Sequence, residues 1–208
     1  MCSIFGSFSK DKLIELAELN RYRGQHSYSY SFYYTDSKDM SVSKGLGEIP
    51  IDQIVIPEGV YCIAHMQAPT TSNKTIEYVH PAYVKGAWLW HNGIIKDHWV
   101  KDSMKKYNLD NSWDTYLILH KYLSTGNLDD IDGTFSCVYY GYNVLQLFRN
   151  EISPLFIDKD HNISSTKFEG SYSLEPNTIW VFDPGVGLHK IGKFNTVENP
   201  YFFMDEAS

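Results

Sequence analysis

The sequence predicts an α+β fold in which sheets are covered by layers of helices. Segments with the pattern of β-strands occupy both ends of the chain, and segments with helical periodicity lie between them. Aromatic residues make up 15% of the 208 residues, with 16 tyrosines, an excess that suits pleated strands better than a helical bundle. No repeat, low-complexity tract or linker interrupts the chain, so residues 1–208 are expected to form a single domain.

The N-terminal segment predicts a strand, a helix and a second strand. Residues 3–8 have the pattern of a short strand, and Ser9 is a suitable N-cap for the helically spaced residues that follow it. Polar and aromatic residues alternate with period two over 27–32, which is typical of a strand with one buried face. The polar segment 36–58 contains two glycines and two prolines and is expected to be a loop-rich connection with room for a short strand.

The middle of the chain predicts two strands followed by two helices. The apolar runs 60–65 and 87–91 each end in a polar cluster, where we expect the strand to give way to a loop that lines a site. Residues 97–107 and 113–124 have helical patterns, and Gly126 supplies a stop signal for the second helix. Short strands separated by turn residues are then expected over 135–142, 144–148, 155–157, 162–166 and 178–182.

Composition excludes several classes of protein. Hydrophobic residues make up 43% and charged residues 21%, which is ordinary globular usage. The net charge is −7 and no basic stripe is present, so direct nucleic-acid binding is not expected. No apolar run approaches the length of a membrane span, and no signal-peptide pattern precedes the first strand. We therefore expect a cytoplasmic protein that does not bind a membrane.

The cysteines and histidines do not form a recognisable metal site. Cys2, Cys62 and Cys137 are too few and too scattered for a disulfide framework or a cysteine-based zinc site, which favours a reducing compartment. The eight histidines form neither the HExxH motif nor a finger spacing. We expect no metal and no cofactor, and we expect Cys62 and Cys137 to be buried in apolar strands.

Cys2 is the most informative residue of the chain. An initiator methionine before a small side chain is normally removed, which would leave a cysteine with a free α-amine. The α-amine titrates at about pH 8, where a general base is effective, and the thiol is a strong nucleophile, so one residue can supply both groups. The simpler interpretation of a single cysteine is a small buried side chain, so other residues must decide between the two.

Four further motifs follow Met1-Cys2-Ser3-Ile4-Phe5-Gly6 in a fixed order. They are Tyr22-Arg23-Gly24-Gln25-His26-Ser27, His65-Met66-Gln67-Ala68-Pro69-Thr70, His91-Asn92-Gly93-Ile94-Ile95 and Asp132-Gly133-Thr134-Phe135. Over nearly the whole chain this series resembles the class II glutamine amidotransferases, which are N-terminal-nucleophile hydrolases. The resemblance implies a four-layer αββα sandwich of two mostly antiparallel sheets.

The resemblance also implies catalytic roles. The Cys2 sulfur would attack the side-chain amide of glutamine, and the Asn92 side chain and the Gly93 backbone N–H would form the oxyanion hole. Arg23 would pack beside the nucleophile. The simpler alternatives are a type I′ hairpin turn at Asn92-Gly93 and a surface ion pair for Arg23.

Four residues are implied to bind the substrate. Asp114 would hold the α-ammonium of glutamine, although an aspartate in the first turn of a helix is also ordinary compensation of the helix dipole. Thr70 and His80 would line the pocket, and His80 is equally consistent with a core histidine. Gln67 stands where the family has an arginine that clamps the substrate carboxylate.

Two residues depart from the family pattern. A neutral amide at Gln67 cannot replace a guanidinium, so Arg23 or another cation binds the carboxylate, or glutamine binds weakly, or the donor is a different amide or γ-glutamyl compound. His26 stands where the family usually has an aspartate, and it places a titratable group in the loop of Arg23.

The sequence therefore predicts a glutaminase-type amidohydrolase that releases ammonia from glutamine through a Cys2 thioester. A chain with this domain alone would supply ammonia to a separate acceptor-modifying synthase. The alternatives are an amidase of the same mechanism with another donor, motivated by Gln67, and a catalytically impaired binding subunit, motivated by Gln67 together with His26. The oligomeric state is left open by the sequence.

Overall fold

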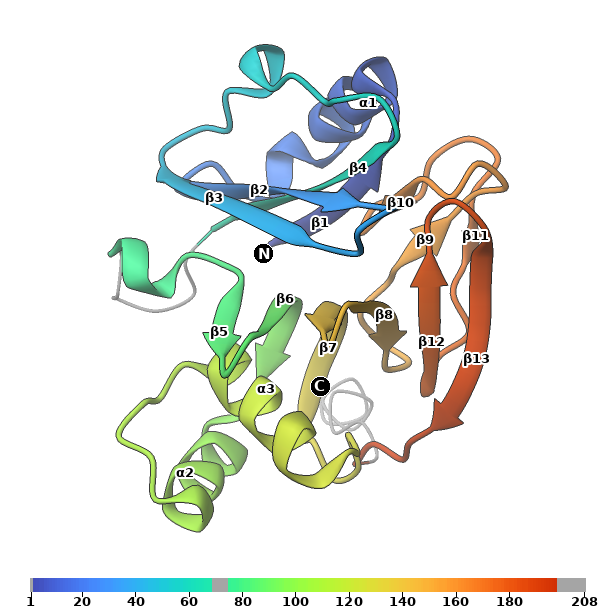
Figure 1. Ribbon diagram of the computed structural model, residues 1–208. Coiled ribbons are helices and arrows are strands. Elements are labelled where there is room, and N and C mark those ends of the chain that lie inside the picture. The colour runs from blue at the N-terminus through green and yellow to red at the C-terminus, as the bar shows by residue number, and fades with distance from the viewer. Residues whose placement is uncertain (1, 69–74, 198–208) are drawn as a thin grey trace, which may run out of the picture.

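The computed structural model describes residues 2–68 and 75–197. It contains two sheets packed face to face, with helices on both outer faces (Figure 1). The predicted α+β class and the αββα sandwich are therefore confirmed. Within the described ranges, no helix is long and apolar enough to cross a membrane.

The first sheet has seven strands, and all of its pairings are antiparallel. In spatial order they are β11 (Tyr172–Ser173), β9 (Phe156–Ile157), β10 (Ile163–Ser164), β1 (Ser3–Ser7), β4 (Val60–Gln67), β2 (Ser27–Tyr34) and β3 (Met40–Leu46). Helix α1 (Lys10–Asn20) covers its outer face. This helix begins after Ser9, whose side chain accepts a hydrogen bond from the Lys12 backbone N at 3.3 Å, as expected for an N-cap.

The second sheet has six strands, and its pairings are also antiparallel. In spatial order they are β13 (Gly187–Lys193), β12 (Thr178–Asp183), β8 (Val144–Arg149), β7 (Gly133–Gly141), β6 (Ala87–Ile95) and β5 (Ala82–Val84). Helices α2 (Asp97–Tyr107) and α3 (Asp114–Thr125) follow β6 and cover the outer face of this sheet (Figure 1). Helix α3 ends at Gly126, which has a left-handed φ of +69°. Three short 3₁₀ helices complete the described elements: η1 (Arg21–Arg23), η2 (Ile51–Gln53) and η3 (Ile76–Tyr78).

Three apolar clusters hold the four layers together. Successive residues of a strand point to opposite faces of the sheet, so neighbouring residues belong to different clusters. On β1, Phe5 packs against α1, whereas its neighbour Ile4 packs between the two sheets. On β6, Leu89 packs under α3 and Trp90 packs between the sheets. The N-terminal end of β1 lies between the sheets close to β6, which brings the start of the chain next to the second sheet (Figure 1).

The structure corrects the predicted end of one strand. β6 does not end at His91 but continues through Asn92 and Gly93, which pair with Ser136 and Phe135 of β7. The type I′ turn that was the alternative for Asn92-Gly93 is therefore wrong. The motif belongs to a strand because its partner is the first half of β7, which lies about forty residues further along the chain.

The strands that the sequence did not predict lie at or near the edges of the sheets. β5, β11 and β13 are all at sheet edges, and β13 is exposed or half-exposed along its whole length. β3, which was expected as a short strand at most, is also an edge strand and has seven residues. Edge strands bury little surface, so their sequences carry a weak apolar alternation.

Candidate active site

Cys2 lies immediately before β1, a strand that is hydrogen-bonded on both sides. Its side chain is 9% exposed, and its Sγ is 3.8 Å from the carbonyl oxygen of Ala68. The Arg23 Nε donates a hydrogen bond of 2.9 Å to the Cys2 carbonyl oxygen, which fixes the backbone beside the thiol. Burial raises the pKa of the Cys2 thiol to about 11. The thiol is therefore protonated at neutral pH, and its attack on a carbonyl carbon requires a base to accept the proton.

Gly93 and Gly133 allow β6 and β7 to approach closely. Gly93 has a φ of +156°, and a Cβ at this position would lie 1.9 Å from the carbonyl oxygen of Thr134. Gly133 has a φ of +148°, and its Cβ would lie 2.5 Å from the carbonyl oxygen of Ile94. Neither position has space for a side chain, so the Gly93 backbone itself forms a wall of the cavity at Cys2.

Gly93→Ala is expected to lower the free energy of unfolding by at least about 3 kcal/mol, because the methyl group would collide with backbone and the left-handed φ disfavours alanine. Gly59→Ala is the matched control, since Gly59 also has a positive φ of +72° but no atom within 4 Å of the added Cβ. It should cost about 1 kcal/mol. Urea denaturation of both variants measures the difference, and equal losses would show that the close approach at Gly93 is not a constraint.

The Asn92 side-chain amide is buried but only weakly bound. Its Nδ2 is 3.5 Å from Ser136 Oγ and 3.4 Å from Ser165 Oγ, both at the long end of hydrogen-bond distances. Ser165 Oγ also accepts a 3.0 Å hydrogen bond from the Ile4 backbone N, so it links Asn92 to the first strand. A donor held this loosely can turn toward a stronger acceptor, such as an oxyanion, at small cost.

A chain of hydrogen bonds runs beside the cavity from Gln67 to His91. The Gln67 Nε2 donates to the Tyr78 carbonyl oxygen at 3.1 Å, which fixes the orientation of the amide. Its Oε1 is 3.1 Å from His80 Nδ1, and because this oxygen only accepts, His80 carries its proton on Nδ1. The His80 Nε2 then accepts from Thr115 Oγ1 at 2.8 Å, and His91 Nδ1 lies 3.2 Å from the same hydroxyl. Protein groups therefore engage the Gln67 amide at both of its ends.

His65 and His80 are buried as neutral rings. Their ring centroids are 4.2 Å apart, and the His65 Nε2 is 3.2 Å from the His91 carbonyl oxygen, to which it donates. Burial lowers the pKa of His65 to about 3 and holds the pKa of His80 well below its usual value. Two neutral imidazoles in this position orient their neighbours without adding charge to the site.

Lys44 ties the two sheets together next to His80. Its Nζ donates hydrogen bonds of 2.6 Å to the carbonyl oxygens of Val79 and Pro81, on either side of His80. Burial lowers the pKa of this ammonium to about 8. Because Lys44 belongs to β3 and Pro81 directly precedes β5, the contact fixes the His80 segment against the first sheet.

Asp114 lies at the start of α3, at the edge of a narrow cavity. One carboxylate oxygen, Oδ1, accepts a 2.7 Å hydrogen bond from the Thr115 backbone N, and the other, Oδ2, is 3.9 Å from His91 Nδ1. The cavity encloses about 30 Å³. Its described lining residues are Cys2, Gln67, Ala68, Tyr78, His80, His91, Gly93, Trp113 and Asp114. They include one carboxylate and no lysine or arginine, so the described wall of this cavity favours a cationic group near Asp114.

The structure thus brings five of the predicted site residues together around one cavity: Cys2, Gln67, His80, Gly93 and Asp114. Arg23 and Asn92 lie directly behind this cavity, through their contacts with the Cys2 carbonyl and with Ser165. Thr70 lies outside the described residues. The His26 side chain is exposed, and only its backbone groups bond within the fold, to Gln67 and Gly47.

Sequence reasoning did not single out Tyr78, Trp113 or Thr115 for the site. Tyr78 and Trp113 line the cavity with ring centroids 5.7 Å apart, and Thr115 connects two histidines. For Trp113 and Thr115, the one sign of a place in the site was that they flank Asp114 in the sequence.

The Asp132-Gly133-Thr134-Phe135 motif has a structural role. The Asp132 carboxylate pairs with Lys96 at 2.8 Å and with His98 at 2.9 Å. These contacts join the residues that follow β6 to the start of β7. They therefore hold the ends of the two strands that carry Gly93 and Gly133.

Two solved structures are similar to this chain over 91% of its length. One is the glutamine phosphoribosylpyrophosphate amidotransferase from B. subtilis in complex with ADP and GMP, with a TM-score of 0.67, 16% identity and 49% of that enzyme's length covered. The other is an allosteric regulatory enzyme of purine biosynthesis, with a TM-score of 0.68, 15% identity and 48% covered.

The chain spans about half the length of these two enzymes. No family model and no curated protein sequence matches it. At identities this low the similarity establishes the fold. The resemblance to the class II glutamine amidotransferases is thereby confirmed at the level of the fold, and the chain has the αββα sandwich that this resemblance implies.

Proposed function

We propose that the protein hydrolyses the side-chain amide of glutamine to glutamate and ammonia, with Cys2 as the nucleophile. The observation that supports this best is the position of the Cys2 thiol, which shares one narrow cavity with the Gly93 backbone and the Asp114 carboxylate. A nucleophile, an oxyanion donor and a partner for an ammonium group are the three elements that amide hydrolysis of an amino acid requires.

The reaction begins when the Cys2 sulfur attacks the carboxamide carbon. The thiol proton passes to the α-amine of Cys2, which is free once Met1 has been removed. This base is needed because the buried thiol, with a pKa of about 11, does not ionise by itself at neutral pH. The tetrahedral oxyanion is stabilised by the Gly93 N–H and the Asn92 side chain, each donor contributing about 3 kcal/mol.

The tetrahedral intermediate then collapses. Its carbon–nitrogen bond breaks, and the proton held by the Cys2 amine leaves with ammonia. Water attacks the resulting thioester with the same amine as base, which releases the carboxylate and restores the thiol. Arg23 acts as a positioning residue, because its hydrogen bond to the Cys2 carbonyl holds the sulfur and the amine in register. Asp114 binds the substrate α-ammonium through Oδ2.

The ammonia is expected to reach a separate protein that aminates an acceptor. In the proposed arrangement this domain carries out the glutaminase reaction, and a synthase chain receives the product. Affinity purification of the full chain followed by an amination assay on the co-purified proteins tests this second step independently of the first.

Incubation with the glutamine analogue diazo-oxo-norleucine, followed by mass spectrometry of the N-terminal peptide, tests the mechanism. We expect covalent labelling at Cys2, on a chain that begins with Cys2, together with ammonia release from glutamine. A chain that retains Met1 and releases no ammonia would instead favour the catalytically impaired binding subunit, because an acylated Cys2 nitrogen is not a base.

A further inference from the structure

A wide groove opens next to the narrow cavity at Cys2. The groove encloses about 530 Å³, within the range of small-molecule sites. It shares Tyr78, Trp113 and Asp114 with the cavity, so the two spaces adjoin along these three residues. The cavity of about 30 Å³ has room for a terminal carboxamide but not for a whole amino acid. A ligand that reaches Cys2 past Tyr78, Trp113 and Asp114 therefore has most of its volume in the groove.

The groove is lined mainly by apolar side chains. Ile94 is 46% exposed although it directly follows Gly93, and Val100 and Met104 of α2 form the facing wall. An apolar side chain left this exposed beside a reactive thiol favours a ligand with an apolar portion. Lys101, also on α2, is exposed at the groove and has no ion pair among the residues that the structure describes.

The charged side chains where the cavity meets the groove indicate which end of a substrate extends into the groove. Asp114 lines both spaces, and its Oδ2 has no hydrogen-bond donor closer than 3.9 Å among the described residues. It therefore favours a free α-ammonium. No lysine or arginine lines the described wall of the cavity, and the Gln67 amide is already engaged by Tyr78 and His80. The described wall therefore offers an α-carboxylate no counter-charge, whereas an amide at the same carbon would need none.

We propose that the preferred substrate is a peptide with an N-terminal glutamine and an apolar second residue, whose side chain lies in the groove between Ile94 and Met104. This inference rests on the proposed amide hydrolysis at Cys2. The free α-ammonium binds Asp114, and the carboxylate of a dipeptide faces Lys101. The peptide bond stays intact: one water is consumed, the glutamine side chain becomes a carboxylate, and ammonia leaves.

Ammonia release from glutamine, Gln-Gly and Gln-Leu tests the substrate class. Burial of one leucine side chain predicts a kcat/KM for Gln-Leu about ten- to a hundredfold above that for Gln-Gly. Both dipeptides should exceed free glutamine, whose carboxylate meets no lysine or arginine on the described wall of the cavity. Hydrolysis of glutamine with no preference for Gln-Leu would overturn the inference and leave the proposed function standing. Release from none of the three would overturn both.

Two groove variants locate the effect. Met104→Glu and the surface change Lys101→Glu should each lower kcat/KM for Gln-Leu at least about fivefold more than they lower that for glutamine. Val186→Glu introduces the same charge at a residue that is 83% exposed and outside the groove lining, and it should change neither value. Thermal unfolding confirms that each variant is folded. Gln-Leu turnover that both groove variants leave intact would place the second residue elsewhere and overturn the inference.

Discussion

Cys2→Ala is expected to reduce ammonia release from glutamine to the background rate, a loss of at least about 10⁴-fold in kcat. In the proposed mechanism the sulfur is the atom that forms the thioester, and no other cysteine or serine is among the described lining residues of the cavity to replace it. Stability should change by less than about 2 kcal/mol, since the substitution removes a single small side chain. An ammonia assay at saturating glutamine, paired with thermal unfolding, measures both effects.

Cys62→Ala is the control for this substitution. Cys62 is fully buried on β4 and packs against Phe5 and α1, on the face of the first sheet away from the cavity. It should retain activity within about twofold. Activity that persists in Cys2→Ala, or that disappears equally in both variants, would show that catalysis does not depend on the thiol at the chain start.

Acidification from pH 7.5 to 5.0 is expected to lower the free energy of unfolding by about 4 kcal/mol through His65 and His80. Burial lowers the pKa of both rings, so the folded state favours their neutral forms. Their contribution is therefore complete above the unfolded pKa of about 6.5 and is lost as the pH falls toward the folded values. At pH 5.0 each ring costs about 2 kcal/mol. Urea denaturation at the two pH values measures the loss.

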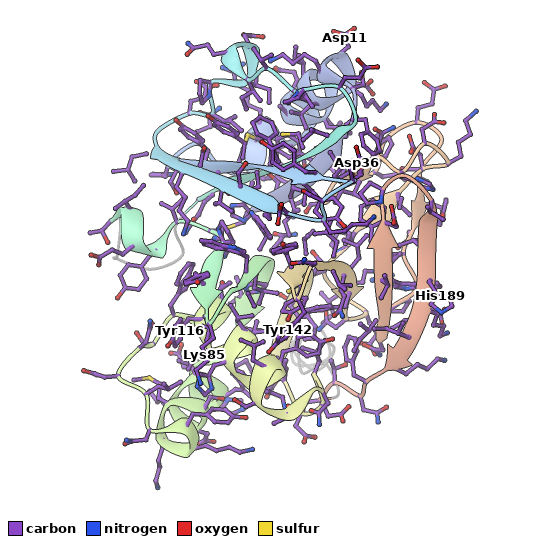
Figure 2. The ribbon with its side chains drawn as sticks, in the orientation of Figure 1. Asp11, Asp36, Lys85, Tyr116, Tyr142 and His189 are labelled. Carbon is purple, nitrogen blue, oxygen red and sulfur yellow. The ribbon has the colours of Figure 1, made fainter. Side chains whose placement is uncertain are left out.

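His189→Gln is the matched control. His189 lies on β13 at the outer edge of the second sheet, where its side chain is exposed (Figure 2). Its removal should leave the loss at pH 5.0 unchanged, whereas His65→Asn should reduce that loss by about half. A protein that is equally stable at both pH values would show that the buried rings take up protons as readily in the folded state as in the unfolded state.

The layer structure could be predicted because buried elements repeat with a period. Alternation over 27–32 matches β2, and the helical pattern over 113–124 matches the extent of α3. β13 has no such pattern, because neighbouring residues such as Lys190 and Ile191 are both exposed at a sheet edge. Local periodicity therefore identifies buried helices and strands, but it misses edge strands, which are hydrogen-bonded to the sheet on one side only.

The site was predicted in part for a different reason. Cys2, Gly93 and Asp114 were identified by motifs, and the structure places all three at one cavity. The extended conformation of Asn92 and Gly93 could not be predicted, because a turn and a paired strand have the same local sequence and only the distant partner β7 distinguishes them. Thr115 was missed since its importance comes from two histidines far away in the chain.

The close backbone approach at Gly93 and Gly133 divides the walls of the site into a fixed one and an adaptable one. At Gly93 and Gly133 the backbones of β6 and β7 lie too close for any side chain, so substitutions at these two positions are not tolerated. This part of β6 should therefore stay unchanged in proteins that keep the site. The opposite wall consists of helix side chains such as Met104 and Lys101, which can be exchanged one at a time. New substrates should therefore arise through α2 while the chemistry at Cys2 is preserved.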